Sequence, residues 1–216
     1  MCTNYAAARR DRLFRHFGVE PPDSPWQDEI YKDYAAPIIR RVDNAPRADL
    51  ATFGMVPRRH IPPGVRVYDT MNARVETLGE KRSFSGAWKR QQLCLIPCES
   101  FYEPCYETGK AVRWRIGMVD GSAFAIAGLW RAWPEEEGEA FSFTMLTVNA
   151  DVHALMSRFH KPGDEKRSVV IVPPQEYENW LASGSMDEAR SFLALLPAQA
   201  FATVEAPVVR EASRQS

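Results

Sequence analysis

Apolar and polar residues alternate over several short stretches in the middle of the chain, which is the pattern of half-buried β-strands. Other stretches there are almost continuously apolar, as in strands that lie in a core. The predicted strands span residues 37–42, 93–102, 112–116, 122–130, 141–148 and 168–172. No helix period separates them regularly, so the pattern favours antiparallel pairing over repeated βαβ units.

Helix-like patterns lie towards the two ends of the chain. They predict helices at 5–17, 151–159, 174–182 and 186–196, and Pro174 suits the first turn of its helix. Together with the strands, they predict an α+β fold. We expect a curved, mostly antiparallel β-sheet core with peripheral helices, built as a single domain.

Length and composition agree with one domain. The chain has 216 residues, of which 45% are hydrophobic, so it can bury a sizeable core. We assign residues 1–207 to the domain and residues 208–216 to a polar C-terminal tail. No apolar run is long enough to span a membrane, and arginines interrupt any leader-like stretch near the start. We therefore expect a cytoplasmic protein without a membrane partner.

The net charge of −1 argues against a uniformly basic nucleic-acid-binding protein. Basic residues still occur in short groups, which is compatible either with a local phosphate-binding face or with ordinary surface charge. The cysteines are expected to be reduced thiols in the cytoplasm. Their spacing does not fit a zinc site, so we expect no metal and no cofactor. They are Cys2, Cys94, Cys98 and Cys105.

Cys2 differs from the other cysteines because removal of Met1 would leave an α-amine and a thiol on one residue. Such a 1,2-aminothiol condenses with an aldehyde to a Schiff base, which the thiol then closes to a thiazolidine ring. Alternatively, the amine, with a pKa of about 8, can act as the base for its own thiol. A cysteine at position 2 can also be there by chance, so its interpretation depends on other residues.

Three further motifs carry groups suited to chemistry. Asn72 and Arg74 occupy alternate positions of an extended segment, where their donors could reach one phosphate or sugar. Glu103 ends an apolar, aromatic run, in which a carboxyl can serve as an acid or base. His160 lies just before a Pro-Gly loop and a buried strand, a suitable place for a proton carrier. Each also fits a purely structural role.

In their order and spacing, these motifs resemble the SOS response-associated peptidase (SRAP) family, the sensors of abasic sites in DNA. The matching segments are Met1-Cys2, Asn72-Ala73-Arg74-x-Glu76-Thr77, Leu95-Ile96-Pro97 with Phe101-Tyr102-Glu103, and Thr147 with His160 and 169–172. The resemblance implies that Met1 is removed, by the protein itself or by an aminopeptidase. Cys2 then forms a thiazolidine crosslink with abasic sites in single-stranded DNA. It thus implies a thiol autopeptidase with lyase-like chemistry.

The resemblance also implies roles for individual residues. The residue matching Asn72 lies close to the cysteine, and those matching Glu103 and His160 handle protons during ring closure and reversal. Arg74 is expected to contact DNA phosphate, and Arg167 is the expected equivalent of a second family arginine. We expect a monomer that acts on single strands, with single/double-strand junctions as a further setting, and that joins the nucleoid when bound to DNA.

The chain departs from the usual family pattern at four places, one of which is Phe53-Gly54-Met55 where members usually have Trp-Gly-Leu. The start reads Thr3-Asn4 where members usually have Gly-Arg. Asn4 is therefore expected to contact DNA without a charge, and Arg40 is one candidate to supply the missing positive charge. Pro104 replaces a common tryptophan, and an inserted loop at 161–165 follows His160. Two other functions are compatible with the sequence: a cysteine peptidase for other proteins, and a non-catalytic module that binds single-stranded DNA.

Overall fold

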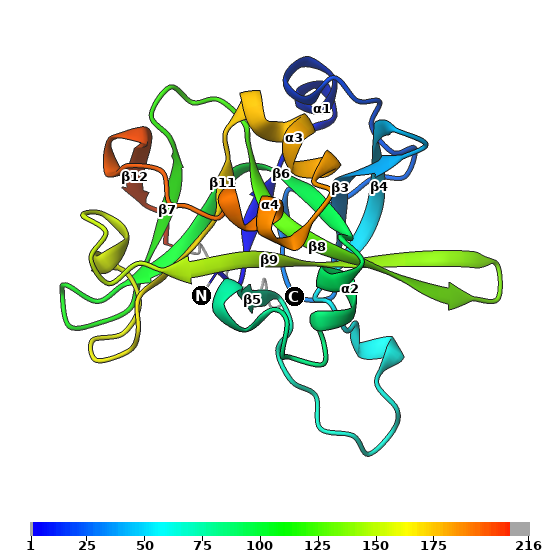
Figure 1. Cartoon of the computed structure of the whole chain (residues 1–216). Coiled ribbons are helices and arrows are strands. Elements are labelled where there is room, and N and C mark those ends of the chain that lie inside the picture. Colours follow the sequence, from blue (N-terminus) through cyan, green and yellow to red (C-terminus); the bar gives the residue numbers. More distant parts are fainter. Residues whose placement is uncertain (1, 208–216) are drawn as a thin grey trace, which may run out of the picture.

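The predicted strands join into a strongly curved sheet that closes into a barrel-like core, as seen in the computed structural model of residues 2–207 (Figure 1). The strands are β1 (Tyr5–Ala7), β2 (Glu29–Ile30), β3 (Ala35–Val42), β4 (Ala45–Phe53), β5 (Asn72–Arg74), β6 (Leu93–Cys105), β7 (Val112–Met118), β8 (Phe124–Glu135), β9 (Gly138–Asn149), β10 (Arg167–Val169), β11 (Ile171–Val172) and β12 (Phe201–Glu205). The helices in this part of the chain are α1 (Arg10–Phe17), α2 (Ser85–Lys89), α3 (Tyr177–Ala182) and α4 (Met186–Ser191).

The predicted α+β class, with a mostly antiparallel sheet and peripheral helices, is confirmed. β6 pairs with β3 and β8, β8 with β9, β9 with β4, and β4 with β3, which completes the ring. Among the described strands, β4–β9 and β5–β9 are the parallel pairs. The proposed tail at 208–216 lies outside the described residues. None of the helices between residues 2 and 207 has the length and apolar character needed to cross a bilayer.

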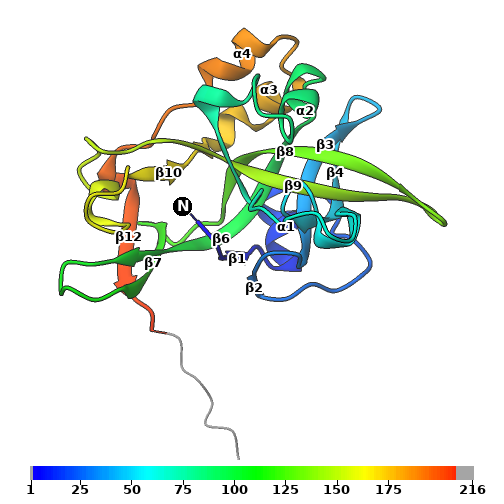
Figure 2. The same cartoon turned by 90° about the horizontal axis from the view of Figure 1, so that it is seen from below.

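β6 is buried on both faces in its first half, which explains why residues 93–98 are continuously apolar rather than alternating. Cys94 and Ile96 of β6 point into the barrel, whereas Leu93 and Leu95 contribute to a second apolar cluster on the outer face. Residues of α2, α3 and α4 complete this outer cluster, and Figure 2 shows these helices gathered over one side of the sheet. Trp180 of α3 donates from Nε1 to the Cys94 carbonyl at 2.9 Å.

The predicted helix at 5–17 was wrong in its first turn. Residues 5–7 form β1, because Tyr5 pairs with both Phe101 and Ile30 and its side chain is fully buried in the barrel. The helix begins only at Arg10. Burial of Tyr5 against distant strands thus outweighs the local helical pattern.

The predicted helix at 151–159 is reduced to a 3₁₀ turn at Met156–Arg158. His153 Nδ1 accepts hydrogen bonds from the backbone N–H groups of Leu155 and Met156. A side chain that satisfies these donors removes the need for helical hydrogen bonds. At the C-terminal end, the helix expected at 186–196 stops at Ser191.

The elements that the sequence did not predict include β2, β4, α2 and β12. β4 contains Pro46 and Arg47, which interrupt any apolar alternation. Its position is set by a two-residue hairpin after β3, in which Asp43 and Asn44 have φ values of 48° and 65°. Positive φ at both central residues is typical of the tight hairpin turn that matches the twist of the strands.

We expect Gly128→Ala to lower the free energy of unfolding by about 1–3 kcal/mol, because the strands leave no room for a methyl group there. A Cβ at Gly128 would lie 2.7 Å from Ile96 Cδ1 and 2.9 Å from the Thr144 carbonyl oxygen. Gly79→Ala is the matched control, since a Cβ at Gly79 would meet open space. Urea unfolding measures both variants, and equal midpoints would contradict the packing described.

Candidate functional site

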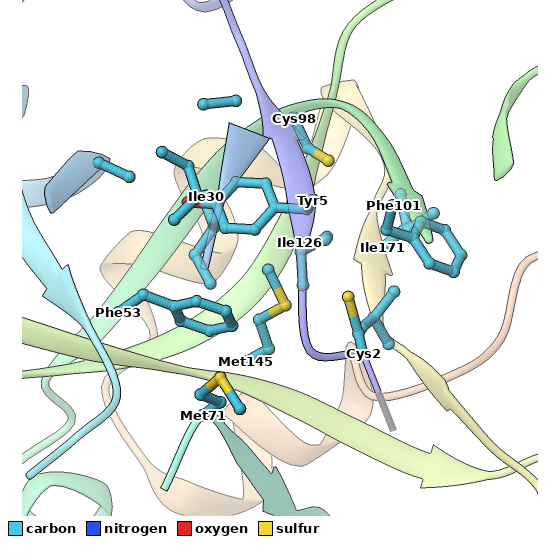
Figure 3. Close-up of a cluster of buried hydrophobic side chains, with 14 of the residues drawn as sticks. Cys2, Tyr5, Ile30, Phe53, Met71, Cys98, Phe101, Ile126, Met145 and Ile171 are labelled. Atoms are coloured by element: carbon cyan, nitrogen blue, oxygen red, sulfur yellow. The ribbon is translucent and has the colours of Figure 1, made fainter. Parts of the chain in front are cut away.

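The first residues of the described chain lie inside the barrel, beside the end of β6. Tyr102 N–H donates to the Asn4 carbonyl at 3.3 Å, and the Cys2 thiol donates to the same oxygen at 3.3 Å. The Cys2 side chain is 1% exposed and belongs to the inner apolar cluster. Figure 3 shows it together with Met71 and Met145 of this cluster. The thiol is therefore fixed in position and shielded from water.

Asn72 anchors the main chain of Cys2. Its Nδ2 donates to the Cys2 carbonyl oxygen at 2.6 Å, and its side chain is buried. Parallel pairing of β5 with β9, which sets Asn72 opposite Met145, brings it there. Its Oδ1 is buried without a hydrogen bond to the described residues. This oxygen is an acceptor available to a donor that enters the site.

Glu103 and His160 form a buried acid–base pair. The distance from Glu103 Oε2 to His160 Nε2 is 3.0 Å, and the side chains are 1% and 8% exposed. Glu103 lies on β6 opposite Trp114 of β7. His160 is held by a hydrogen bond of 2.8 Å from its N–H to the Pro104 carbonyl. Its φ of 68° is unusual for a histidine, and such backbone strain is common at functional sites.

The surroundings of Cys2 disfavour its thiolate. Burial raises the pKa of the Cys2 thiol well above its ordinary value, and the negative charge of Glu103 raises it further. At neutral pH the sulfur is therefore protonated. A nucleophile of this kind needs a partner group to start the reaction, because the thiolate is the reactive form.

Arg74 and Arg167 both contact the carboxylate of Glu165. Arg74 Nη1 and Arg167 Nη1 each lie 2.6 Å from an oxygen of Glu165. Arg167 is only 2% exposed, and it also pairs with Glu76 at 2.8 Å and donates to the Thr147 carbonyl at 2.7 Å. The Arg74 side chain is 48% exposed. The two expected phosphate contacts thus form one cluster, and their role towards DNA stays a prediction.

The other two expected DNA contacts are separate from this cluster. Asn4 is buried, and its Nδ2 donates to Glu29 Oε2 at 3.3 Å. Arg40 is 8% exposed, pairs with Asp49 at 2.7 Å and covers the rings of Trp130 and Phe141.

Arg40 also lies far from the reactive residues along the sheet. It pairs with Cys94 at the start of β6, whereas Glu103 lies near the end of that strand. The structure thus brings together Cys2, Asn72, Glu103 and His160 but not Arg40. Contacts of Asn4 and Arg40 with DNA stay predictions.

Sequence reasoning missed two parts of this region. One is Glu165, whose contact with Arg74, 91 positions away in the sequence, leaves no local signal. The other is Arg113, whose guanidinium lies 3.4 Å from the centre of the Tyr102 ring and 2.8 Å from Glu29. The alternation at 112–116 did place an arginine there, but its partner could not be inferred.

Comparison with known proteins identifies the family of this chain. Residues 1–212 match the family model described as SOS response associated peptidase (SRAP). The chain belongs to the SRAP family. It is 31% identical over 121 residues to the abasic site processing protein YoqW of Bacillus subtilis, and 32% identical over 132 residues to YobE of the same species. These matches cover 56% and 60% of this chain but only 51% and 57% of the relatives, so the chain spans about half of their length.

Solved SRAP-like structures share the fold. A crystal structure of a protein from Bordetella bronchiseptica superposes with a TM-score of 0.85 at 33% identity, covering 96% of this chain and 100% of that one. A protein from Bacteroides thetaiotaomicron has a TM-score of 0.76 at 20% identity, covering 94% and 91%. The second likeness shows the fold alone.

We expect Cys2 of the folded protein to react slowly with iodoacetamide at pH 7, because burial and the raised thiol pKa leave little thiolate. The rate should increase about tenfold per pH unit below that pKa as long as the fold holds. Peptide mass spectrometry after timed labelling measures it. In guanidinium chloride all four cysteines should label rapidly. Fast labelling of Cys2 in the folded protein at pH 7 would contradict this description.

Proposed function

We propose that this chain processes abasic sites in DNA by forming a covalent adduct through Cys2. The observation that carries the proposal is the convergence of Cys2, Asn72 and the Glu103–His160 pair in one buried place. Membership of the SRAP family and the names of the Bacillus relatives, which are abasic site processing proteins, support it. Such a protein would act in the cytoplasm and associate with the nucleoid when bound to DNA.

The reaction requires that Met1 is removed first. Until then the Cys2 nitrogen is an amide, which is not a nucleophile. Removal, by the protein's own thiol or by an aminopeptidase, frees an α-amine beside the thiol. The hydrogen bond from Asn72 to the Cys2 carbonyl holds the residue in place without engaging its nitrogen or its sulfur. We infer that Asn72 is a positioning residue.

The chemistry then follows from the two groups on Cys2. The amine adds to the aldehyde carbon of the ring-opened abasic sugar and gives a carbinolamine. Loss of water, helped by proton delivery to its oxygen, gives a Schiff base. The sulfur adds to the imine carbon while the thiol proton is transferred to nitrogen, which closes the thiazolidine. Glu103 and His160, 3.0 Å apart, are suited to carry these protons.

The DNA backbone would pass over the face that holds Arg74. Half of this side chain is exposed, and it lies beside Arg167 next to the site. Positive charge at this place would hold a phosphate that flanks the lesion. An aldehyde reaches a buried thiol most readily when its sugar is unstacked, which favours single strands or strand junctions.

We expect the purified protein to form a one-to-one covalent adduct with a single-stranded oligonucleotide that contains one abasic site. Intact-mass spectrometry measures it and reports at the same time whether Met1 is absent. The adduct should lack one water relative to the sum of its parts. Cys2→Ala should give none.

Cys98→Ala is the matched control, since Cys98 is a buried cysteine of the same apolar cluster, and it should form the adduct normally. An undiminished adduct from Cys2→Ala, or none from the wild type, would reject the proposal. Salt-dependent binding without an adduct would favour the non-catalytic module. Turnover of peptides that depends on Cys2 would favour the peptidase.

We expect Glu103→Gln and His160→Gln to slow adduct formation by about 10²-fold or more, because each removes one partner of the proton-carrying pair. Single-turnover rates measured from pH 5 to 9 test this. The pH profile should change in both variants, whereas a purely structural role would lower the rate equally at every pH. Circular dichroism establishes that the variants are folded.

A further inference from the structure

Three nitrogen atoms from different elements converge on one carboxylate. Arg74 Nη1 lies 2.6 Å from Glu165 Oε2, Arg167 Nη1 lies 2.6 Å from Oε1, and Asn149 Nδ2 lies 3.3 Å from Oε1. Two guanidinium groups and an amide that surround two oxygens form a site suited to any oxyanion, a phosphate above all. The carboxylate of Glu165 therefore occupies an anion-binding site formed by the chain's own side chains.

The arginine at the bottom of this site is fixed before any ligand arrives. Arg167 is 2% exposed, and its Nη2 donates to the Thr147 carbonyl at 2.7 Å and to Glu76 at 2.8 Å. Its Nε lies 3.2 Å from Thr147 Oγ1. These bonds leave Nη1 directed at Glu165. An anion that replaced this carboxylate would thus meet a donor already in place.

Glu165 itself stands on the inserted loop at 161–165, all of whose residues are exposed. The base of the loop is held, because Lys166 Nζ donates to the carbonyls of His160 and Lys161 at 3.1 and 2.8 Å. The Glu165 side chain is one third exposed, so rotation of that side chain alone can withdraw its carboxylate into solvent. Burial raises its pKa, but the hydrogen bonds from Arg167 and Asn149 outweigh this and lower it, so the group is ionised at neutral pH.

We propose that the Glu165 carboxylate competes with a DNA phosphate for Arg74 and Arg167. The inference rests on the proposed function, since it takes DNA as the ligand of these arginines. DNA must displace Glu165 before its backbone can bind here, which weakens the hold on any strand. An undamaged strand then dissociates readily, whereas a strand with an abasic site is retained by the covalent bond.

Glu165→Gln tests the competition, because it removes the charge and keeps the shape. Fluorescence anisotropy with an undamaged single-stranded oligonucleotide should show binding that is about 3- to 10-fold tighter than in the wild type at low salt. The slope of log affinity against log salt should become steeper by about one, since the arginine pair then presents one more net positive charge to the DNA backbone. Glu165→Ala, which also removes the side chain's reach, should tighten binding as well.

Glu137→Gln is the matched control for net charge, because Glu137 is exposed in the turn between β8 and β9. It should leave the affinity unchanged within about twofold. Equal gains in Glu137→Gln and Glu165→Gln, or no gain in either Glu165 variant, would overturn the proposal. Thermal unfolding establishes that the variants fold.

The outcomes also separate this inference from the proposed function. Tighter binding by Glu165→Gln without any adduct from the wild type on an abasic strand would reject the crosslinking function and support the competition. An adduct from the wild type, with unchanged affinity in Glu165→Gln, would support the crosslinking function and reject the competition.

Discussion

The double role of β6 is the constraint on which the rest of the structure depends. Its first half pairs with β3 and β8 and closes the barrel, and its second half pairs with β1 and β7. That second half carries Glu103 and also accepts, through Pro104, the hydrogen bond that positions His160. Because β1 leads back to Cys2, one strand register sets the distance between the nucleophile and its acid–base pair. A shift by one residue would turn Glu103 out of the site.

The closed barrel explains why the candidate site is buried. Cys2, Asn72, Glu103 and His160 are each at most 9% exposed, so their interactions are little screened by water. The same burial makes an unpaired polar atom costly, and two contacts that involve the backbone hold the site: Asn72 to the Cys2 carbonyl, and His160 N–H to the Pro104 carbonyl. The arginine cluster differs, because Arg74 and Glu165 are partly exposed and their pairing can be exchanged. The fixed, buried site residues therefore lie beside an arginine cluster whose ion pairs can be exchanged.

The sequence pattern predicted the elements whose formation depends on neighbouring residues, and it failed where distant contacts decide. Strands with clear alternation, such as 112–116 and 141–148, were found, whereas β4 was missed because Pro46 and Arg47 conceal its period. The first turn of the helix at 5–17 was misassigned, because the partners of Tyr5 are 25 and 96 residues away. It was the resemblance to the SRAP family that implied a common site for Asn72, Glu103, His160 and Cys2. Glu165 stayed hidden, since its bond to Arg74 spans 91 residues and has no sequence signature.

The raised pKa of the Cys2 thiol determines the order of steps in the proposed reaction. A protonated, buried sulfur attacks poorly, whereas an α-amine with a pKa of about 8 is partly neutral near pH 7. The amine therefore adds first, and only an aldehyde or ketone can give it a Schiff base. The sulfur then closes the ring within the same residue, where its effective concentration is very high and a low thiolate fraction suffices. In the proposed reaction, the burial that slows attack by the thiol on general electrophiles would thus make the complete residue selective for aldehydes.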